Sequence, residues 1–248
     1  MCPIKLIGFD LDDCLFNSTG LSERARIKGI QAMIDLGLNV DREVAISIIQ
    51  EIVQEYSSNF SMHYDYFLRR LIHQKKNLDI SFHDQYKYIA AAVIAYHREK
   101  VETVKLYSDV EPCLRRLKET NLKSIIISDG NPIKQHEKIL RLGLDKLIDF
   151  VFISDEIGIK KPNPELFRYS LKKSGVSEKE AIYIGDRIDL DIVPAKRINM
   201  HCIYIHRGGK HDIKITGTNP TKENEPDYYI SSLKELFPII DEINKKLG

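Results

Sequence analysis

Three carboxylates follow the first apolar run of the chain, and they are the residues best suited to chemistry. Residues 4–13 read Ile-Lys-Leu-Ile-Gly-Phe-Asp-Leu-Asp-Asp, so Asp10, Asp12 and Asp13 end a strand-like segment. In an extended chain Asp10 and Asp12 point the same way and Leu11 points the other way. Two such carboxylates repel by about 4 kcal/mol at about 4 Å and an effective dielectric near 20. We therefore expect them to recruit a hard divalent cation, most simply Mg²⁺.

Three later segments carry further polar groups, two of them directly after strand-like runs. Residues 123–131 read Lys-Ser-Ile-Ile-Ile-Ser-Asp-Gly-Asn, residues 158–167 read Gly-Ile-Lys-Lys-Pro-Asn-Pro-Glu-Leu-Phe, and residues 181–191 read Ala-Ile-Tyr-Ile-Gly-Asp-Arg-Ile-Asp-Leu-Asp. In order, the chain offers a DxD, a Ser, a Lys-Pro and a GDxxxxD. Open α/β sheets bind their ligands just outside the carboxyl ends of strands, which is where most of these groups fall.

These four motifs, in this order and spacing, resemble the haloacid dehalogenase-like (HAD) hydrolase superfamily, in the branch whose helical cap lies between the first and second motifs. The match covers essentially the whole chain. It implies Mg²⁺-dependent hydrolysis of a phosphate monoester through an aspartyl-phosphate. The run Tyr-Ser-Ser-Asn-Phe, followed by Tyr-Asp-Tyr-Phe-Leu-Arg-Arg-Leu, also resembles archaeal members that act on glyceraldehyde 3-phosphate, so a triose phosphate is a candidate substrate.

The resemblance assigns a role to each acidic motif residue. Asp10 is the expected nucleophile. Asp12 is expected to protonate the leaving oxygen and then to activate water, while its carbonyl contacts the metal. Asp10, Asp12 and Asp186 are thus the expected Mg²⁺ ligands. Asp191 is expected to lie just behind them and to orient Lys161 or a metal-bound water.

The other two motifs are expected to hold the phosphoryl group. Ser128 can donate its hydroxyl proton to a phosphoryl oxygen. The backbone N–H groups of Asp129 and Gly130 can add to it, because they precede a helix N-terminus, where anions are favoured. The resemblance places the functional lysine directly before Pro-x-Pro, which selects Lys161 over Lys160. Its ammonium would offset the charge of the nucleophile and of the phosphoryl oxygens.

Three residues depart from the superfamily pattern. Cys14 stands where Thr is usual, and its thiol is a weaker hydrogen-bonding group. Leu190 replaces a commonly polar residue beside Asp191. Pro194 takes a position that Gly often occupies, and it is tolerable only within the first turn of a helix.

The alternation of elements predicts an α/β fold. Strand-like runs appear near 4–9, 123–128, 150–153, 181–185, 202–206 and 228–230, and helical segments separate the later ones. This order is typical of a Rossmann-like, mostly parallel sheet with helices on both faces. Asn131-Pro132 and Asn163-Pro164 are N-cap and first-turn signals for two helices, which Gly143 and Gly175 would end. Asn199 could take the left-handed turn after the last motif.

The segment between residues 18 and 104 lacks a clear strand and has helical periodicity. We expect four helices there: one from a cap at Ser22 to Gly37, a second helix, one over 61–75 and one over 82–102. The second helix carries a stripe of Val44, Ile48, Ile52 and Tyr56, with Ala45, Ile49 and Val53 beside it. This predicts an inserted α-helical cap domain, with residues 1–17 and 105–248 as the catalytic core. The polar stretch 207–227 is expected to be a long surface loop.

Composition narrows the class of protein. Of the 248 residues 43% are hydrophobic, which suffices for a packed core, and the formal net charge is +1 from 37 basic and 36 acidic residues. That balance argues against a nucleic-acid or polybasic membrane surface. No run of eighteen apolar residues occurs, so a cytoplasmic protein is expected. Cys2, Cys14, Cys113 and Cys202 form no CxxC pair, which favours free thiols over a zinc site or disulfides.

The expected function is therefore the hydrolysis of a small phosphorylated metabolite. A phosphomutase of the same fold remains an alternative, because the motif residues are common to both reactions. A haloacid dehalogenase is less favoured, since halide loss needs no proton from Asp12. A catalytically idle binding module is disfavoured by the full set of motif residues. The sequence leaves the oligomeric state and the physiological substrate open.

Overall fold

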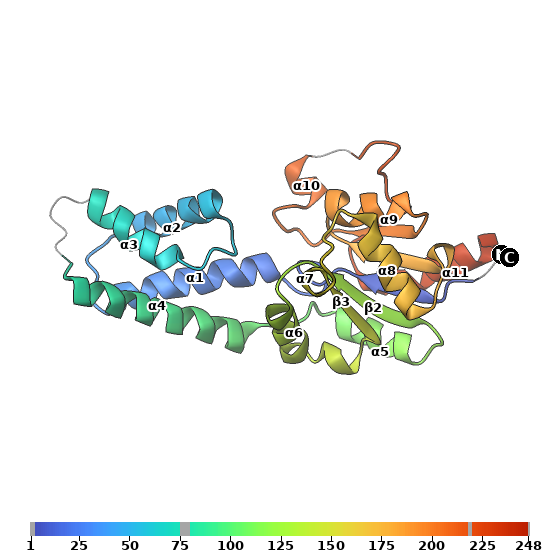
Figure 1. The fold of residues 1–248 in the computed structure, drawn as a ribbon, viewed down its shortest axis with the longest axis horizontal. Helices are drawn as coiled ribbons and strands as arrows, with labels where there is room; N and C mark the ends of the chain where they lie inside the picture. Colours follow the sequence, from blue (N-terminus) through green and yellow to red (C-terminus); the bar gives the residue numbers. More distant parts are fainter. Residues whose placement is uncertain (1–2, 75–79, 218–219, 248) are drawn as a thin grey trace. The chain divides into compact units, whose positions relative to one another are not determined.

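The computed structural model describes residues 3–74, 80–217 and 220–247 (Figure 1). The chain divides into two compact units, one of Met1–Thr19 with Lys105–Gly248 and the other of Gly20–Val104. The expected insertion, 18–104, differs from the second unit by two residues at its start. We call the first the sheet unit and the second the helical unit, and describe each by itself.

A six-stranded parallel sheet forms the centre of the sheet unit. Its strands are β1 (Leu6–Phe9), β2 (Lys123–Ser128), β3 (Phe150–Ile153), β4 (Ala181–Gly185), β5 (His201–Ile205) and β6 (Tyr228–Ile230). They lie in the order β3-β2-β1-β4-β5-β6, and every neighbouring pair is parallel. The helices described in this unit are α5 (Val110–Lys118), α6 (Pro132–Arg141), α7 (Ser154–Ile157), α8 (Pro164–Ser174), α9 (Val193–Arg197), α10 (Ile213–Thr216) and α11 (Leu236–Leu247). The predicted Rossmann-like α/β fold is confirmed.

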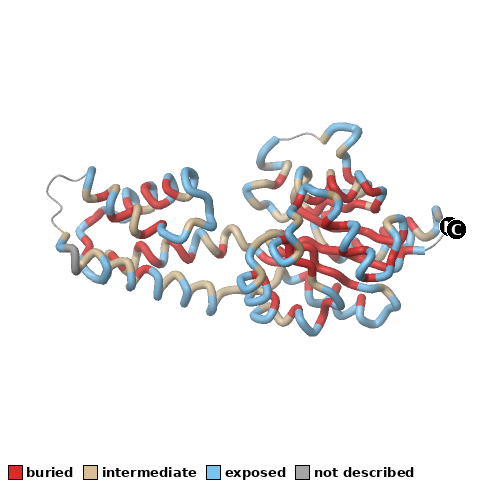
Figure 2. Tube along the Cα trace, viewed as in Figure 1, coloured by how far each residue is buried: buried red, intermediate tan, exposed pale blue. Residues whose placement is uncertain are grey.

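Both faces of the sheet are buried, which explains why the strands read as continuous apolar runs. Leu6 and Ile125 belong to a hydrophobic cluster that α8 and α9 complete. Ile7 and Ile126, which alternate with them and so point to the other face, are equally inaccessible to solvent. Figure 2 shows buried backbone, in red, through the middle of this unit. A sheet covered in this way leaves only its ends for polar side chains.

The strand register brings the motif segments to one edge of the sheet. Phe9, the last residue of β1, pairs with Ile126 of β2 and with Ile184 of β4. Asp10 therefore follows β1 at the level where β2 and β4 are also ending. This is the topological reason why residues 128–130 and 186–191 meet the first motif.

The expected helix boundaries of the sheet unit are confirmed. Asn131 caps α6 by accepting a hydrogen bond from the N–H of Lys134, and Asn163 caps α8 in the same way. Both helices have Pro in their first turn, and Pro194 likewise lies in the first turn of α9. Gly143, Gly175 and Asn199 adopt the left-handed backbone conformation that was expected of them.

The helical unit contains α1 (Ser18–Asp35), α2 (Arg42–Tyr56), α3 (His63–Gln74) and α4 (Phe82–Thr103). Two details of its prediction are wrong. Helix α1 begins at Ser18 rather than after a cap at Ser22, because the Asp13 carboxylate accepts hydrogen bonds from the N–H and hydroxyl of Thr19 and provides an earlier start. The two ends of the expected stripe on α2, Val44 and Tyr56, are exposed, whereas its middle residues Ile48 and Ile52 are buried together with the neighbouring Ala45 and Ile49.

The stretch 207–227 is not wholly loop. It contains α10, and the Asp212 side chain that caps this helix is 4% exposed. Asp212 also accepts from His206 at 2.9 Å, which ties the segment to the end of β5. Of the cysteines, Cys14, Cys113 and Cys202 are buried free thiols, as expected, and Cys2 lies outside the described residues.

Candidate active site

The turn after β1 presents Asp10 in a fixed position. The N–H of Asp10 donates to the carbonyl of Ile184 at 2.9 Å, and the thiol of Cys14 lies 3.7 Å from the same carbonyl. Asp13 adopts a left-handed conformation (φ 61°), which turns the chain back toward the sheet. Arg207 donates to the Cys14 carbonyl at 3.0 Å. Cys14, which stands where Thr is usual in the superfamily, is thus buried, and its thiol contacts the neighbouring strand β4.

Lys161 meets Asp10 inside the protein. Its ammonium lies 2.6 Å from Asp10 Oδ1, 2.7 Å from Asp191 Oδ1 and 2.8 Å from the hydroxyl of Tyr183. The side chain is 3% exposed. A lysine ammonium has three protons, and each has a partner here. Lys160, the other candidate, is 65% exposed and pairs with Asp155.

Tyr183 is a residue of this site that the motifs did not indicate. Its hydroxyl donates to the Ile127 carbonyl at 3.1 Å and accepts from Lys161. The ring has room because Gly8 faces it: a Cβ on Gly8 would lie 2.9 Å from the Tyr183 ring. The signal was present as a tyrosine in an otherwise aliphatic buried strand, since a buried hydroxyl needs a polar partner.

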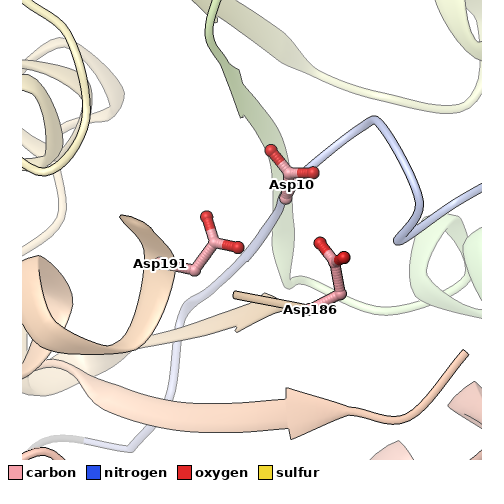
Figure 3. Close-up of side chains that lie close together, drawn as sticks. All are labelled: Asp10, Asp186 and Asp191. Carbon is pink, nitrogen blue, oxygen red and sulfur yellow. The ribbon is translucent and has the colours of Figure 1, made fainter. Parts of the chain in front are cut away.

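Three carboxylates from two strand ends form one cluster. Oxygens of Asp10, Asp186 and Asp191 all lie within 4.8 Å of one another (Figure 3). Asp191 belongs to a single π-helical turn, Ile188–Ile192, and also accepts from the N–H of Arg187 at 3.1 Å. Gly185 permits this turn to fold back, because a Cβ there would lie 2.4 Å from the Asp191 side chain.

The electrostatics of this cluster call for a cation. Burial raises the pKa of Asp10 to about 7 against the opposing charge of Lys161. Burial, together with Asp10 and Asp191, raises the pKa of Asp186 to about 9. Fully ionised, three carboxylates and one ammonium would leave two excess negative charges in a buried place, and the raised pKa values of Asp10 and Asp186 reflect that cost. A divalent cation that prefers oxygen ligands fits this donor set, with Asp10 and Asp186 in position to ligate it.

Asp12 lies apart from these three carboxylates. Lys138 of α6 contacts both Asp12 oxygens at 2.7 Å, and the Gln135 amide donates to Oδ2 at 3.0 Å. Burial alone would raise the pKa of Asp12, but Lys138 and Gln135 outweigh it and hold that pKa below its ordinary value. Lys138 and Gln135 thus engage the Asp12 carboxylate, and it does not belong to the cluster of Asp10, Asp186 and Asp191. The expected contact of the Asp12 carbonyl with a metal stays a prediction.

The end of β2 supplies the expected hydroxyl. Ser128 is 1% exposed, and its Oγ accepts from the Gln135 amide at 2.6 Å. Asp129 uses its carboxylate to accept from the N–H of Lys161 at 3.1 Å, which links two motifs. The N–H of Gly130 donates to the Ser154 hydroxyl oxygen at 3.0 Å. Its expected hydrogen bond to a phosphoryl oxygen stays a prediction, and it would have to replace or share this contact.

Gln135 and Lys138 are further residues that the motifs did not indicate. They lie three positions apart, and residues at that spacing share one face of a helix. Asn131 and Pro132 mark the start of α6 after β2, so the sequence could place this helix near the site, but it could not give the rotation that turns this face toward Asp12.

Comparison with known proteins decides the family. A glyceraldehyde 3-phosphate phosphatase from Methanopyrus kandleri is 39% identical over 245 residues, which cover 98% of this chain and 99% of that protein. One from Pyrococcus furiosus is 39% identical over 244 residues, which cover 98% and 96%. The model of the family described as haloacid dehalogenase-like hydrolase matches residues 35–205. The chain belongs to the haloacid dehalogenase-like hydrolase family.

Solved structures of this family share the fold. A HAD phosphatase from Thermococcus onnurineus superposes with a TM-score of 0.63 at 22% identity, covering 96% of this chain and 98% of that one. A 2-haloacid dehalogenase from Pseudomonas syringae gives 0.57 at 23% identity, covering 99% and 100%. One fold thus serves two reactions, so the reaction of this HAD protein must be argued from its side chains and its curated relatives.

The curated relatives confirm the expected enzyme class, a phosphoric monoester hydrolase of the HAD superfamily. Within the described ranges, no helix combines the length and apolar character needed to cross a membrane.

Proposed function

We propose that this HAD hydrolase removes the phosphoryl group of a small metabolite with Mg²⁺, through an aspartyl-phosphate on Asp10, and that glyceraldehyde 3-phosphate is its substrate. The contact of Lys161 with both Asp10 and Asp191 supports the assignment of Asp10 most directly. The ammonium lowers the pKa of Asp10 against the larger effect of burial, and so favours the anionic form, which is the form that attacks phosphorus.

The residues divide the reaction between them. One Asp10 oxygen attacks phosphorus while the bond to the leaving oxygen breaks, and Asp12 gives that oxygen a proton. In the second step Asp12 takes a proton from water, which attacks the aspartyl-phosphate and releases inorganic phosphate. Ser128 donates to a phosphoryl oxygen in both steps. Bound Mg²⁺, held by Asp10, Asp186 and the Asp12 carbonyl, would neutralise charge on the phosphoryl oxygens.

The Asp12 environment matches the second of these steps. Its lowered pKa keeps it ionised in the free protein, which is the form required of a base. A phosphate dianion brought beside it raises its pKa by like-charge repulsion, which favours the protonated form required in the first step.

The proposed substrate rests on the relatives. The similarity to the two named phosphatases spans both units of this chain, so it includes the helical unit as well as the sheet unit. We propose that the helical unit serves as the cap that selects the organic part of the substrate.

The test is chemical quenching during turnover, with the acid-labile acyl-phosphate trapped and mapped to a peptide. We expect label on Asp10, none in Asp10→Asn, and release of inorganic phosphate from glyceraldehyde 3-phosphate in a screen of phosphorylated metabolites. Label on another residue would refute the assignment of the nucleophile. Transfer of the label to a second sugar hydroxyl instead of water would identify a phosphomutase.

A further inference from the structure

The Gln135 carboxamide joins two groups that act in different parts of the proposed reaction. Its nitrogen lies 3.0 Å from Asp12 Oδ2, 2.6 Å from Ser128 Oγ and 2.9 Å from the Asp129 carbonyl. The residue is 3% exposed, so water does not compete strongly for these bonds. A single rigid group therefore fixes the spacing between the acid–base carboxylate and the phosphate-binding hydroxyl.

The direction of the bond to Ser128 has a consequence for phosphate binding. Because the amide nitrogen is a donor, Ser128 Oγ accepts, and its own hydroxyl proton is not used by Gln135. That proton is left to donate to a phosphoryl oxygen. Gln135 thus sets the direction in which Ser128 donates, in addition to holding its oxygen in place.

Lys138 restrains the other end of this arrangement. The Asp12 side chain is 31% exposed, so without a partner its carboxylate could turn into solvent. The Lys138 ammonium contacts both carboxylate oxygens at 2.7 Å and lies over the Phe16 ring. Together with the amide of Gln135, it fixes the plane in which the Asp12 carboxylate lies.

We propose that Gln135 and Lys138 are positioning residues of the reaction: Lys138 aligns Asp12 for proton transfer, and Gln135 aligns Asp12 and Ser128 relative to each other. This inference rests on the proposed function, since it presupposes that Asp12 carries the proton. A purely structural role, in which both residues only fasten α6 to the turn after β1, predicts a different outcome. It would lower stability, or slow all substrates alike.

The leaving group separates these two roles. Proton transfer from Asp12 matters for an alkyl phosphate, whose alkoxide is a poor leaving group, and matters less for an aryl phosphate. The comparison uses kcat/KM, which reports steps up to the first irreversible one and so excludes hydrolysis of the aspartyl-phosphate. For Lys138→Met we expect kcat/KM to fall about 10- to 100-fold for glyceraldehyde 3-phosphate and only a few-fold for an aryl phosphate.

The chain offers a matched control on the same helix. Lys134 is exposed, and its side chain makes no hydrogen bond or ion pair among the described residues, so Lys134→Met removes the same charge without touching Asp12. We expect it to resemble the wild type for both substrates. Lys138→Arg, which keeps a two-oxygen contact with the carboxylate, should restore most of the lost activity. Equal losses for alkyl and aryl substrates in Lys138→Met, or no rescue by Arg, would overturn the assignment of Lys138.

Variants of Gln135 should differ from those of Lys138 in their kcat/KM for the aryl phosphate. Gln135→Leu removes the donor to Ser128 as well as the donor to Asp12, so the aryl substrate should also lose kcat/KM, and the alkyl substrate should lose more. Gln135→Glu keeps the shape but supplies an acceptor, which draws the Ser128 proton away from phosphate and repels Asp12. We expect it to be at least as impaired as Leu. A Glu variant as active as the wild type would refute the role of Gln135.

Two further measurements keep the inferences separate. Thermal unfolding shows whether a variant still folds. If the Gln135 variants do not fold, the kinetics of the Lys138 variants test the proposal, because Lys138 is only half-buried. Asp10→Asn reports on the proposed function itself. If it remains active, the proposed function fails; if it is inactive while Lys138→Met and Gln135→Leu match the wild type on both substrates, only the present inference fails.

Discussion

Lys161 and Asp10 are 151 residues apart in the chain, yet the ammonium nitrogen of one lies 2.6 Å from a carboxylate oxygen of the other. The remaining two protons of the ammonium go to Asp191 and Tyr183. Lys161 is therefore bound to Asp10, the proposed nucleophile, in the free protein, and a phosphoryl oxygen would have to share one of its donors. The lysine organises the site before it stabilises any charge on a substrate.

Replacement of this lysine should impair turnover of every substrate. Lys161→Ala leaves two buried carboxylates without their cation, and we expect kcat/KM to fall by about 10²-fold or more for alkyl and aryl phosphates alike. Lys160→Ala is the control, because Lys160 is exposed and pairs with Asp155 outside the cluster. Steady-state kinetics on several substrates provides the measurement. Similar losses in the two variants would assign the function to neither lysine.

Magnesium should stabilise the protein more strongly as pH rises. The pKa values of about 7 for Asp10 and about 9 for Asp186 lie above the value of about 3.9 in an unfolded chain. The folded, metal-free protein then binds more protons than the unfolded chain, so these groups lower its free energy of unfolding as pH rises from about 4 toward 9. Metal binding requires both carboxylates deprotonated, which becomes easier over the same range.

Thermal unfolding at about pH 5, 7 and 9, with and without Mg²⁺, measures this effect. The gain in Tm on adding Mg²⁺ should increase with pH and should be lost in Asp186→Asn. Asp189→Asn should keep it, because Asp189 is exposed and pairs with Arg187. A gain that is constant with pH would contradict the expected coupling, and chelation should abolish turnover.

Much of the fold was predictable because local signals were strong. Asn131 and Asn163, each followed by Pro, gave the starts of α6 and α8, and continuous apolar runs gave the buried strands. The prediction failed where a tertiary contact overrides a local pattern. Asp13, outside the helix, moved the start of α1 to Ser18, and packing leaves Val44 and Tyr56, the two ends of the expected stripe on α2, exposed.

The site was predictable at the ends of strands but less so on the helices. Asp10, Lys161, Asp186 and Asp191 come together because parallel strands end at one edge. The Asp12 carboxylate makes a separate set of contacts, with Lys138 and Gln135 of α6. Its partners on α6 could not be inferred from the motifs, because their contacts depend on the rotation of that helix.

Substitution of Gly185 should damage the metal site by steric means alone. A Cβ there would lie 2.4 Å from Asp191, so Gly185→Ala must displace the carboxylate that holds Lys161. We expect a loss of about 1–3 kcal/mol in the free energy of unfolding, and weaker Mg²⁺ binding. Gly209→Ala is the control, since nothing lies within 4 Å of its added Cβ. Urea denaturation and Mg²⁺ titration measure both effects; if Gly185→Ala matched Gly209→Ala in both, the close packing against Asp191 would not matter.

The division of labour between Asp10 and Asp12 gives the sharpest prediction. Asp12→Asn keeps the polar contact with Lys138 and Gln135 possible but cannot transfer a proton, so alkyl phosphates should lose about 10²–10⁴-fold in kcat/KM. An aryl phosphate should still phosphorylate Asp10, because its leaving group needs little protonation. The aspartyl-phosphate should then accumulate, since no base activates water.

Rapid quenching should show a burst of phenolate with stoichiometric label on Asp10. Asp10→Asn, whose amide oxygen is a poor nucleophile, should show neither burst nor label. Steady turnover of the aryl phosphate by Asp12→Asn at the wild-type rate, without accumulated label, would mean that another group activates the water.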